Sequence, residues 1–289
     1  MDILQFLLAP FIASLILTGI HAYLGVHVVE RGVIFVDLAL AQIAAFGTTI
    51  GFLMGFALHG PGSYWFSLGF TFLGAALFAL TRMHQGKIPQ EAFIGITYAV
   101  SAAAAILAMS KAPEGAEHIK DMLVGNILVV SWPEVWKTAG LYAAIGLFHW
   151  VFRKQFLKIS MDADAAEREG IAVRFWDFLF YVSFGFVVTS SVAIAGVLLV
   201  FSYLIVPSVT AMLFAERIGC RLAIGWVTGT VVSTLGIAAS FWLDLPTGAA
   251  IVVTFGIVLI CAALLRAAGF KRPRRCNPSL GMVTDAGAR

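Results

Sequence analysis

Long apolar stretches constrain this chain more than any other feature of its sequence. Nine of them are long enough to form helices that cross a lipid bilayer, which takes about 20 mainly apolar residues. Only 12% of the 289 residues are charged, against about 25% in soluble globular domains. We therefore predict an all-α fold, a polytopic transmembrane helical bundle. The predicted spans are Ile3–Leu24, Val33–Leu58, Trp65–Thr81, Ala92–Ser110, Val135–Phe152, Phe175–Val192, Val197–Phe214, Leu222–Trp242 and Thr247–Leu265.

The sixth and seventh predicted spans are separated only by the short segment Ala193–Gly196. This connection leaves two alternatives open, nine full spans or eight spans with one half-helix. In both cases residues 1–270 form a single transmembrane domain. Residues 271–289 form a basic and then polar tail, which has the composition of a disordered segment.

Lysine and arginine are distributed unequally between the two sides of this arrangement. With nine spans, sixteen of the 19 basic residues fall on one side, and only Lys111, Lys120 and Lys137 fall on the other. The positive-inside rule places the basic side in the cytoplasm. We therefore predict a cytoplasmic C-terminus and an N-terminus outside, whereas eight spans would invert the N-terminal half. The basic tail is expected to lie on anionic lipid, and no nucleic-acid partner is predicted.

Two polar side chains lie within the second predicted span. An ionisable group inside a membrane is costly and usually lines a transport path or pairs with a partner. Asp37 is therefore a candidate for the transport path and for contact with a metal ion. Gln42 lies five residues further on, about 140° around the helix, so the two side chains cannot point directly at one ligand. The simpler alternatives are that Asp37 is an interfacial carboxylate paired with Arg31 or with a backbone amine, and that Gln42 makes an interhelical hydrogen bond.

Three polar residues, His21, His27 and Glu30, flank the first predicted connection between spans. Imidazole and carboxylate groups suit divalent metal ions. The alternative is that these side chains are solvated at the level of the lipid headgroups.

Glycine and proline mark further positions of interest. Gly196 and Pro207 are candidates for a helix break or gate, because broken helices in membranes line cavities; an ordinary proline kink is the alternative. Gly47, Gly51 and Gly55 recur at four-residue spacing on the second span, and Gly225 and Gly229 form a similar pair. Small faces of this kind let helices approach closely, either within one subunit or at a dimer seam.

Common catalytic signatures are missing from the sequence. It has no GxxxxGK[ST] phosphate-binding loop, and neither HExxH nor GxSxG is present. We therefore predict that the chain is not an enzyme. A secondary transporter, an intramembrane enzyme assembled from distant spans and a structural scaffold remain alternatives to an ATP-driven transporter.

Four ordered stretches resemble the permease subunits of zinc-, manganese- and iron-type ATP-binding cassette importers. A glycine followed by Val-Val and arginine leads into the second span, and an acidic residue precedes Ile-Gly-Ile in the fourth. A Gly-x-Ile-Leu-x-Val pattern precedes the fifth span, and Gly-x-Leu-Leu with a later Leu-Ile-x-Pro-x-x-Thr-Ala covers the seventh. In this chain the stretches begin at Gly25, Glu91, Gly125 and Gly196.

The resemblance also covers the most charged loop, about residues 154–174. Its MDADAAEREGIAV segment, from Met161, is similar to the short cytoplasmic element of the family that couples to the ATPase. The matching positions here are Asp162, Ala166, Gly170 and Ile171. From the residues alone, the stretch is a short polar helix that ends at Gly170.

The resemblance implies an importer-type permease fold in a bacterial inner membrane and several partners. These are a second copy of the permease, a cytosolic ATP-binding subunit that binds and hydrolyses ATP, an extracytoplasmic solute-binding protein and membrane lipid. No cofactor is expected in this chain itself. The expected function is import of a divalent metal ion (zinc, manganese or iron) or a metal-related substrate, with a secondary transporter or an importer of a non-metal solute as the alternative.

One position pattern departs from the family. Its members often carry Gly-Asp on the second span and a histidine four residues after that aspartate, and these residues are implicated in metal passage. Here Asp37, Leu38 and Gln42 occupy those three positions. A carboxylate is thus kept one position early, about 100° around the helix. This departure leaves two alternatives, an ion handled by weaker oxygen ligands or a substrate that is a chelate or another solute.

Overall fold

The computed structural model describes residues 3–57, 60–82, 88–110 and 127–269, and within them the chain is entirely helical. The predicted tail, residues 271–289, lies outside the described residues. Nine of the helices have 18 or more residues, and each corresponds to one predicted span. The helices are α1 (Ile3–Glu30), α2 (Val36–Leu53), α3 (Pro61–Leu80), α4 (Gln90–Met109), α6 (Trp132–Val151), α7 (Arg153–Met161), α8 (Ala163–Arg168), α9 (Val173–Ala195), α10 (Val197–Phe214), α11 (Ile218–Leu243) and α12 (Thr247–Ala267), with a short 3-10 turn, η1, at Ile127–Val129.

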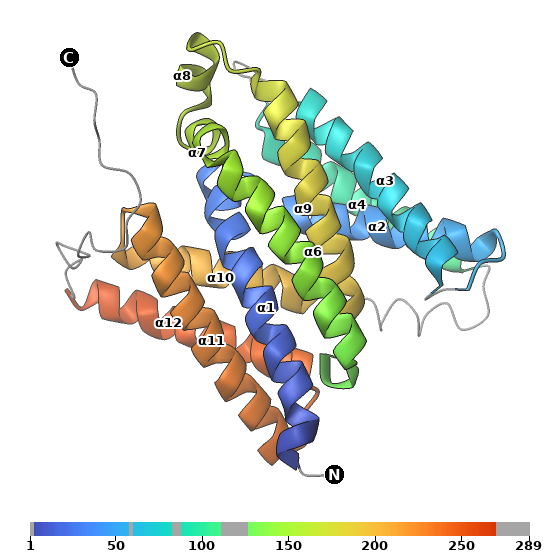
Figure 1. Cartoon of the computed structure of the whole chain (residues 1–289), viewed down its shortest axis with the longest axis vertical. Coiled ribbons are helices and arrows are strands. Elements are labelled where there is room, and N and C mark those ends of the chain that lie inside the picture. Colours follow the sequence, from blue (N-terminus) through green and yellow to red (C-terminus); the bar gives the residue numbers. More distant parts are fainter. Residues whose placement is uncertain (1–2, 58–59, 83–87, 111–126, 270–289) are drawn as a thin grey trace.

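Eight of these helices are long and apolar enough to cross a membrane. The ninth, α6, is 20 residues long but carries Glu134, Lys137 and His149 among its apolar residues, which makes it less apolar than the others. It packs beside α1 and α9, as Figure 1 shows. The half-helix expected near Ala193–Gly196 in the eight-span alternative is not found, because α9 and α10 are two separate full-length helices. It is α6 that falls outside the eight candidate spans.

The helices of the bundle fall into two groups (Figure 1). In one group α2 packs on α3 and α4, and α3 packs on α9. In the other, α1 packs on α10 and α11, and α12 packs on α10 and α11. One continuous hydrophobic core, with Leu24, Val36, Phe184 and Tyr203 among its buried members, runs through both groups.

Glycines allow the closest helix contacts within the subunit. A Cβ at Gly47 would lie 2.8 Å from the carbonyl oxygen of Phe66, and one at Gly51 would lie 3.0 Å from Cα of Ser63, both on α3. A Cβ at Gly229 would overlap Thr18 of α1. Gly47, Gly51, Gly225 and Gly229 are thus used for packing inside one subunit, as the simpler interpretation expects, whereas Gly55 follows the end of α2 and a Cβ there would meet nothing within 4 Å.

The basic ends of several helices meet at one end of the bundle. Arg31 follows α1 and Arg82 follows α3, and both pair with Asp177 in the first turns of α9. Arg221, near the start of α11, pairs with Glu30 at the end of α1. Nine crossings place all four of these helix ends on the same side, as the distribution of basic residues predicts.

Candidate functional site

Asp37 and Gln42 are both buried inside the subunit. Their side chains are 2% and 8% exposed, although they lie on different faces of α2. The reason is that α2 packs against α3, α4, α9 and α10, so that several of its faces are covered. Backbone N–H of Leu38 donates to Oδ1 of Asp37 over 2.8 Å. Of the two alternative partners expected for Asp37, a backbone N–H is therefore the one found, whereas Arg31 pairs with Asp177 instead.

A second carboxylate reaches the start of α2 from α4. Glu91, in the first turn of α4, accepts a hydrogen bond from the backbone N–H of Phe35 (3.0 Å). Phe35 precedes Asp37 by two residues, so that both carboxylates lie at the start of α2. The other carboxylate oxygen of Glu91, Oε2, is buried and has no hydrogen-bond partner in the described part of the chain. Two acidic groups are thus gathered at one end of α2, and no cluster of three or more His, Cys, Asp or Glu side chains is found among the described residues.

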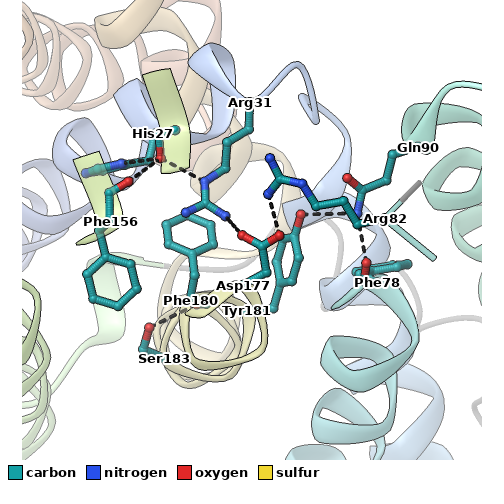
Figure 2. A network of polar contacts seen from close by, with 11 residues as sticks. His27, Arg31, Phe78, Arg82, Gln90, Phe156, Asp177, Phe180, Tyr181 and Ser183 are labelled. Carbon is teal, nitrogen blue, oxygen red and sulfur yellow. Dashed lines mark hydrogen bonds and ion pairs between the residues drawn. The ribbon is translucent and has the colours of Figure 1, made fainter. Parts of the chain in front are cut away.

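A buried ion cluster joins the end of α1, the end of α3 and the start of α9. Asp177 is fully buried and accepts from Arg31 Nη1 over 2.6 Å and from Nη1 of Arg82. Figure 2 shows this carboxylate between the two guanidinium groups. Arg31 also lies over the ring of Phe180, with Cζ 3.9 Å from the ring centroid. Burial lowers the pKa of Arg31, whereas the Asp177 carboxylate acts in the opposite direction.

The end of α4 nearest this cluster is fixed by Gln90. Its Nε2 donates to the carbonyl oxygen of Phe78 (2.8 Å) and to the hydroxyl of Tyr181 (3.3 Å). Tyr181 lies one turn after Asp177 on α9. The starts of α4 and α9 and the end of α3 are therefore held together by polar contacts as well as by packing.

The same end of the bundle contains His27, which the sequence placed near the headgroups. Helix α1 continues to Glu30, beyond the predicted Leu24, so that His27 is 1% exposed inside the bundle. Its Nδ1 lies 2.8 Å from Oγ of Ser160 on α7. Arg31 Nε donates to the same oxygen, also over 2.8 Å.

A second polar cluster lies further along α1. His21 is fully buried; its Nδ1 donates to the carbonyl oxygen of Leu17 (2.8 Å), and its Nε2 lies 3.1 Å from Oγ of Ser191. The hydroxyl of Tyr142 on α6 also hydrogen-bonds Ser191. These contacts satisfy polar groups that would otherwise be stranded in a nonpolar interior, and they connect α1, α6 and α9. Neither His21 nor His27 is a solvated headgroup residue.

Comparison with known proteins gives the family. The model of the family described as "ABC 3 transport family" matches residues 3–266. The chain belongs to the ABC 3 transport family. It is a membrane permease of an ATP-binding cassette system, in which ATP hydrolysis resides in a separate subunit.

Named relatives cover nearly the full length of this permease. It is 25% identical over 266 residues to the manganese transport system membrane protein MntC of Listeria innocua, covering 90% of both chains. It is 27% identical over 263 residues to a Haemophilus influenzae protein described as an iron transport system membrane protein, again covering 90% of both.

Solved structures share the fold. The structure titled "PsaBC from Streptococcus pneumoniae in complex with Fab" matches with a TM-score of 0.74 and 26% identity, over 90% of this chain and 92% of the other. A metal-chelate type ABC transporter in an inward-facing conformation matches in fold with a TM-score of 0.68 at 19% identity. The predicted importer-type permease fold is confirmed.

The predicted coupling segment of the permease forms the short helix α8. Asp162 caps its start, because Oδ1 accepts the backbone N–H of Ala165 over 2.8 Å. Gly170, with φ of +80°, ends it, and the backbone N–H of Ile171 returns to the carbonyl oxygen of Ala166 (3.0 Å). Left-handed backbone after a helix favours glycine because a side chain there is strained. The polar helix predicted from these residues is thus present, and it remains a predicted ATPase contact.

The two predicted gate positions differ in their effect on the backbone. Gly196 has φ of +76° and separates α9 from α10. Pro207 lies inside α10, which continues to Phe214, and it packs near Gly225 of α11. Gly196 is therefore a break between helices and Pro207 is not, while a gating role for either stays a prediction.

Sequence reasoning missed Asp177, Arg82 and Ser160 as parts of one cluster. Asp177 lies inside the predicted span Phe175–Val192, so the rule that selected Asp37, a carboxylate within an apolar span, also applies to it. Ser160 carries no comparable signal, because one buried serine in a basic segment looks like any other. One of its three hydrogen-bonding contacts is local to α7, and the other two, to His27 and Arg31, arise only from tertiary structure.

Proposed function

We propose that this permease imports a divalent transition-metal ion, manganese or iron, across the inner (plasma) membrane of a bacterium. The support is the family assignment together with full-length relatives that are described as manganese or iron transport proteins. The single structural observation that carries the metal assignment is the pair of buried polar groups on α2, Asp37 and Gln42.

The chemistry of these groups favours one class of metal. Asp37, Gln42 and the neighbouring Glu91 offer carboxylate and amide oxygens. Oxygen ligands suit manganese, whereas imidazole and thiolate suit zinc. The family histidine is replaced by Gln42 in this chain. We therefore propose manganese(II) as the first substrate to test, with iron(II) second and zinc(II) third.

The proposed machine contains two copies of the permease, two cytosolic ATP-binding subunits and an extracytoplasmic binding protein. The binding protein delivers the ion to the outer face, and ATP closes the cytosolic subunits against α8. In this mechanism α8, with Asp162, Ala166, Gly170 and Ile171, is the docking element. The path opens between the helices around α2, and Asp37 and Gln42, on different faces of this helix, contact the ion at successive points of its passage.

The first test is uptake by the assembled transporter in proteoliposomes with manganese(II) chloride and ATP. We expect ATP-dependent manganese uptake by the wild type. The double variant Asp37→Ala, Gln42→Ala should reduce the uptake rate at least tenfold, because even outer-shell partners of metal sites contribute about 10–100-fold in affinity or activity. Metal content of the vesicles is measured by mass spectrometry, with iron(II) and zinc(II) run in parallel.

The control variant is Asp244→Asn, since Asp244 is an exposed carboxylate just after α11 with left-handed backbone that asparagine tolerates. It should transport like the wild type. Uptake by the double variant equal to that of the wild type would refute the path assignment. ATP hydrolysis by the wild type without uptake of any of the three metals would refute the metal assignment and leave a non-metal solute.

A further inference from the structure

The α7 and α8 helices and the start of α9 form one packed unit. Ala166 of α8 is fully buried against Ile159 of α7 and Val173 of α9, which form a small hydrophobic cluster separate from the main core. Figure 1 shows α7 and α8 together at one end of the bundle, where α6 ends and α9 begins. A force applied to α8 therefore moves α7 and the start of α9 with it.

Ser160 is the point at which this unit contacts α1. It lies in the last turn of α7, two residues before the cap Asp162, and is 6% exposed. Its hydroxyl donates to the carbonyl oxygen of Phe156 over 2.8 Å. The oxygen also contacts Arg31 Nε and His27 Nδ1, each at 2.8 Å.

The hydrogen-bonding capacity of a hydroxyl determines which group donates in each of these contacts. A serine hydroxyl has one donor and two acceptor positions. Because its proton is directed to Phe156, both other groups must donate to it, and His27 must carry a proton on Nδ1. All hydrogen-bonding positions of the Ser160 hydroxyl are thus occupied. Two of its three bonds go to the C-terminal end of α1 and to the residue that follows it.

The end of α1 is held on its other side by the same unit. Arg31 donates to Asp177 of α9 over 2.6 Å, and Figure 2 shows that guanidinium directed at the carboxylate, with Phe180 beneath it. The polar end of α1 is therefore hydrogen-bonded to both α7 and α9. A displacement of α8 cannot leave the end of α1 in place without breaking these contacts.

Helix α1 passes such a displacement on to α10. At Gly25 the two helices touch through backbone, since a Cβ there would overlap the carbonyl oxygen of Leu204 and the hydroxyl of Ser208. No side chain separates the two backbones at this point to absorb movement. The contacts thus form a continuous physical route from α8 through Ser160 and α1 to α10, which is the kind of packed network that carries coupling between sites.

We propose that Ser160 is a positioning residue that couples movement of the α8 segment to α1 and thereby to the transport path. The proposal rests on the proposed function, in which α8 contacts the ATP-binding subunit. Ser160 touches neither ATP nor the transported ion. Its contribution is to the number of ions moved for each ATP hydrolysed.

The test compares Ser160→Ala with Ser202→Ala in the assembled transporter. Ser202 is also buried, at 5% exposure, but among the described residues its hydroxyl bonds only the carbonyl oxygen of Leu198 on its own helix. Two ratios are measured in proteoliposomes: manganese(II) uptake per ATP hydrolysed, and stimulation of ATP hydrolysis by the loaded binding protein. Ser160→Ala should lower both by roughly fivefold, in line with network mutations that alter coupling, while Ser202→Ala leaves both unchanged.

A second pair of variants separates coupling from stability. Ser160→Thr and Ser160→Val add similar bulk and differ only in the hydroxyl. Both measured ratios should therefore be roughly fivefold higher for the threonine variant than for the valine variant. Equal ratios for this pair, or wild-type ratios for Ser160→Ala, would overturn the proposal. Stimulation of ATP hydrolysis is measured separately from uptake of the ion. A wild type that is stimulated but moves no manganese therefore contradicts the metal assignment alone.

Discussion

Replacing Asp177 with asparagine should lower the free energy of unfolding by about 3–5 kcal/mol, the usual cost of removing one partner from a buried ion pair. The substitution keeps the shape of the side chain and removes its charge. Arg31 and Arg82, whose side chains are 1% and 14% exposed, then lose their shared carboxylate. Guanidinium groups do not lose their protons in proteins, so both charges stay buried. Thermal unfolding of the purified permease in detergent measures the effect.

Two further variants sharpen this prediction. Asp244→Asn removes an exposed carboxylate and should change the free energy of unfolding by no more than about 0.5 kcal/mol, as is usual for surface substitutions. Adding Arg82→Gln to Asp177→Asn should recover part of the lost stability, because one of the uncompensated charges is removed. A melting temperature of Asp177→Asn within the error of the wild type would show that the cluster does not stabilise the fold.

Substituting alanine for Gly25 should destabilise the permease by about 3 kcal/mol, at the upper end of the usual cost of overpacking. The added Cβ would overlap Leu204 and Ser208 and would lie 2.9 Å from the carbonyl carbon of Leu204. Nonbonded carbon atoms need about 3.5–4.0 Å. Much of the conflict is with the backbone of α10, so no change of side-chain rotamer can relieve it, and the two helices must separate.

Gly19 provides the matched control on the same helix. A Cβ at Gly19 meets nothing within 4 Å, so Gly19→Ala should be neutral or stabilising by up to about 1 kcal/mol through helix propensity. Gly19→Ala should therefore have a clearly higher melting temperature than Gly25→Ala. If the two variants have the same melting temperature, the close approach of α1 and α10 is not a constraint on the fold.

Much of the architecture was predictable because it depends on local chemistry. Lipid cannot hydrogen-bond the backbone, so long apolar stretches must form helices, and each of the nine predicted spans is a helix. Asp162 and Gly170 mark the start and end of α8 by capping and by left-handed backbone, both of which act within a few residues. The break at Gly196 also follows from its own backbone angle.

The candidate sites were only partly predictable. Asp37 and Gln42 were selected because polar groups in an apolar span are costly, and both are buried. That argument does not single out a partner: it allowed Arg31 or a backbone amine for Asp37, and only the backbone contact is found. Arg31 and Asp177 are separated by 146 positions in sequence and meet only because the end of α1 and the start of α9 lie at the same side of the bundle.

What the sequence determined by itself was a membrane permease with helices of known position, a capped polar segment between α7 and α9, and polar groups at depth. Tertiary structure alone decided that α1 extends to Glu30, that Asp177 joins Arg31 to Arg82, and that Ser160 lies against His27. The physical reason is the range of the interactions. Apolar length and helix capping are encoded by neighbouring residues, whereas a buried charge takes whichever partner the packing of distant helices brings within hydrogen-bond distance.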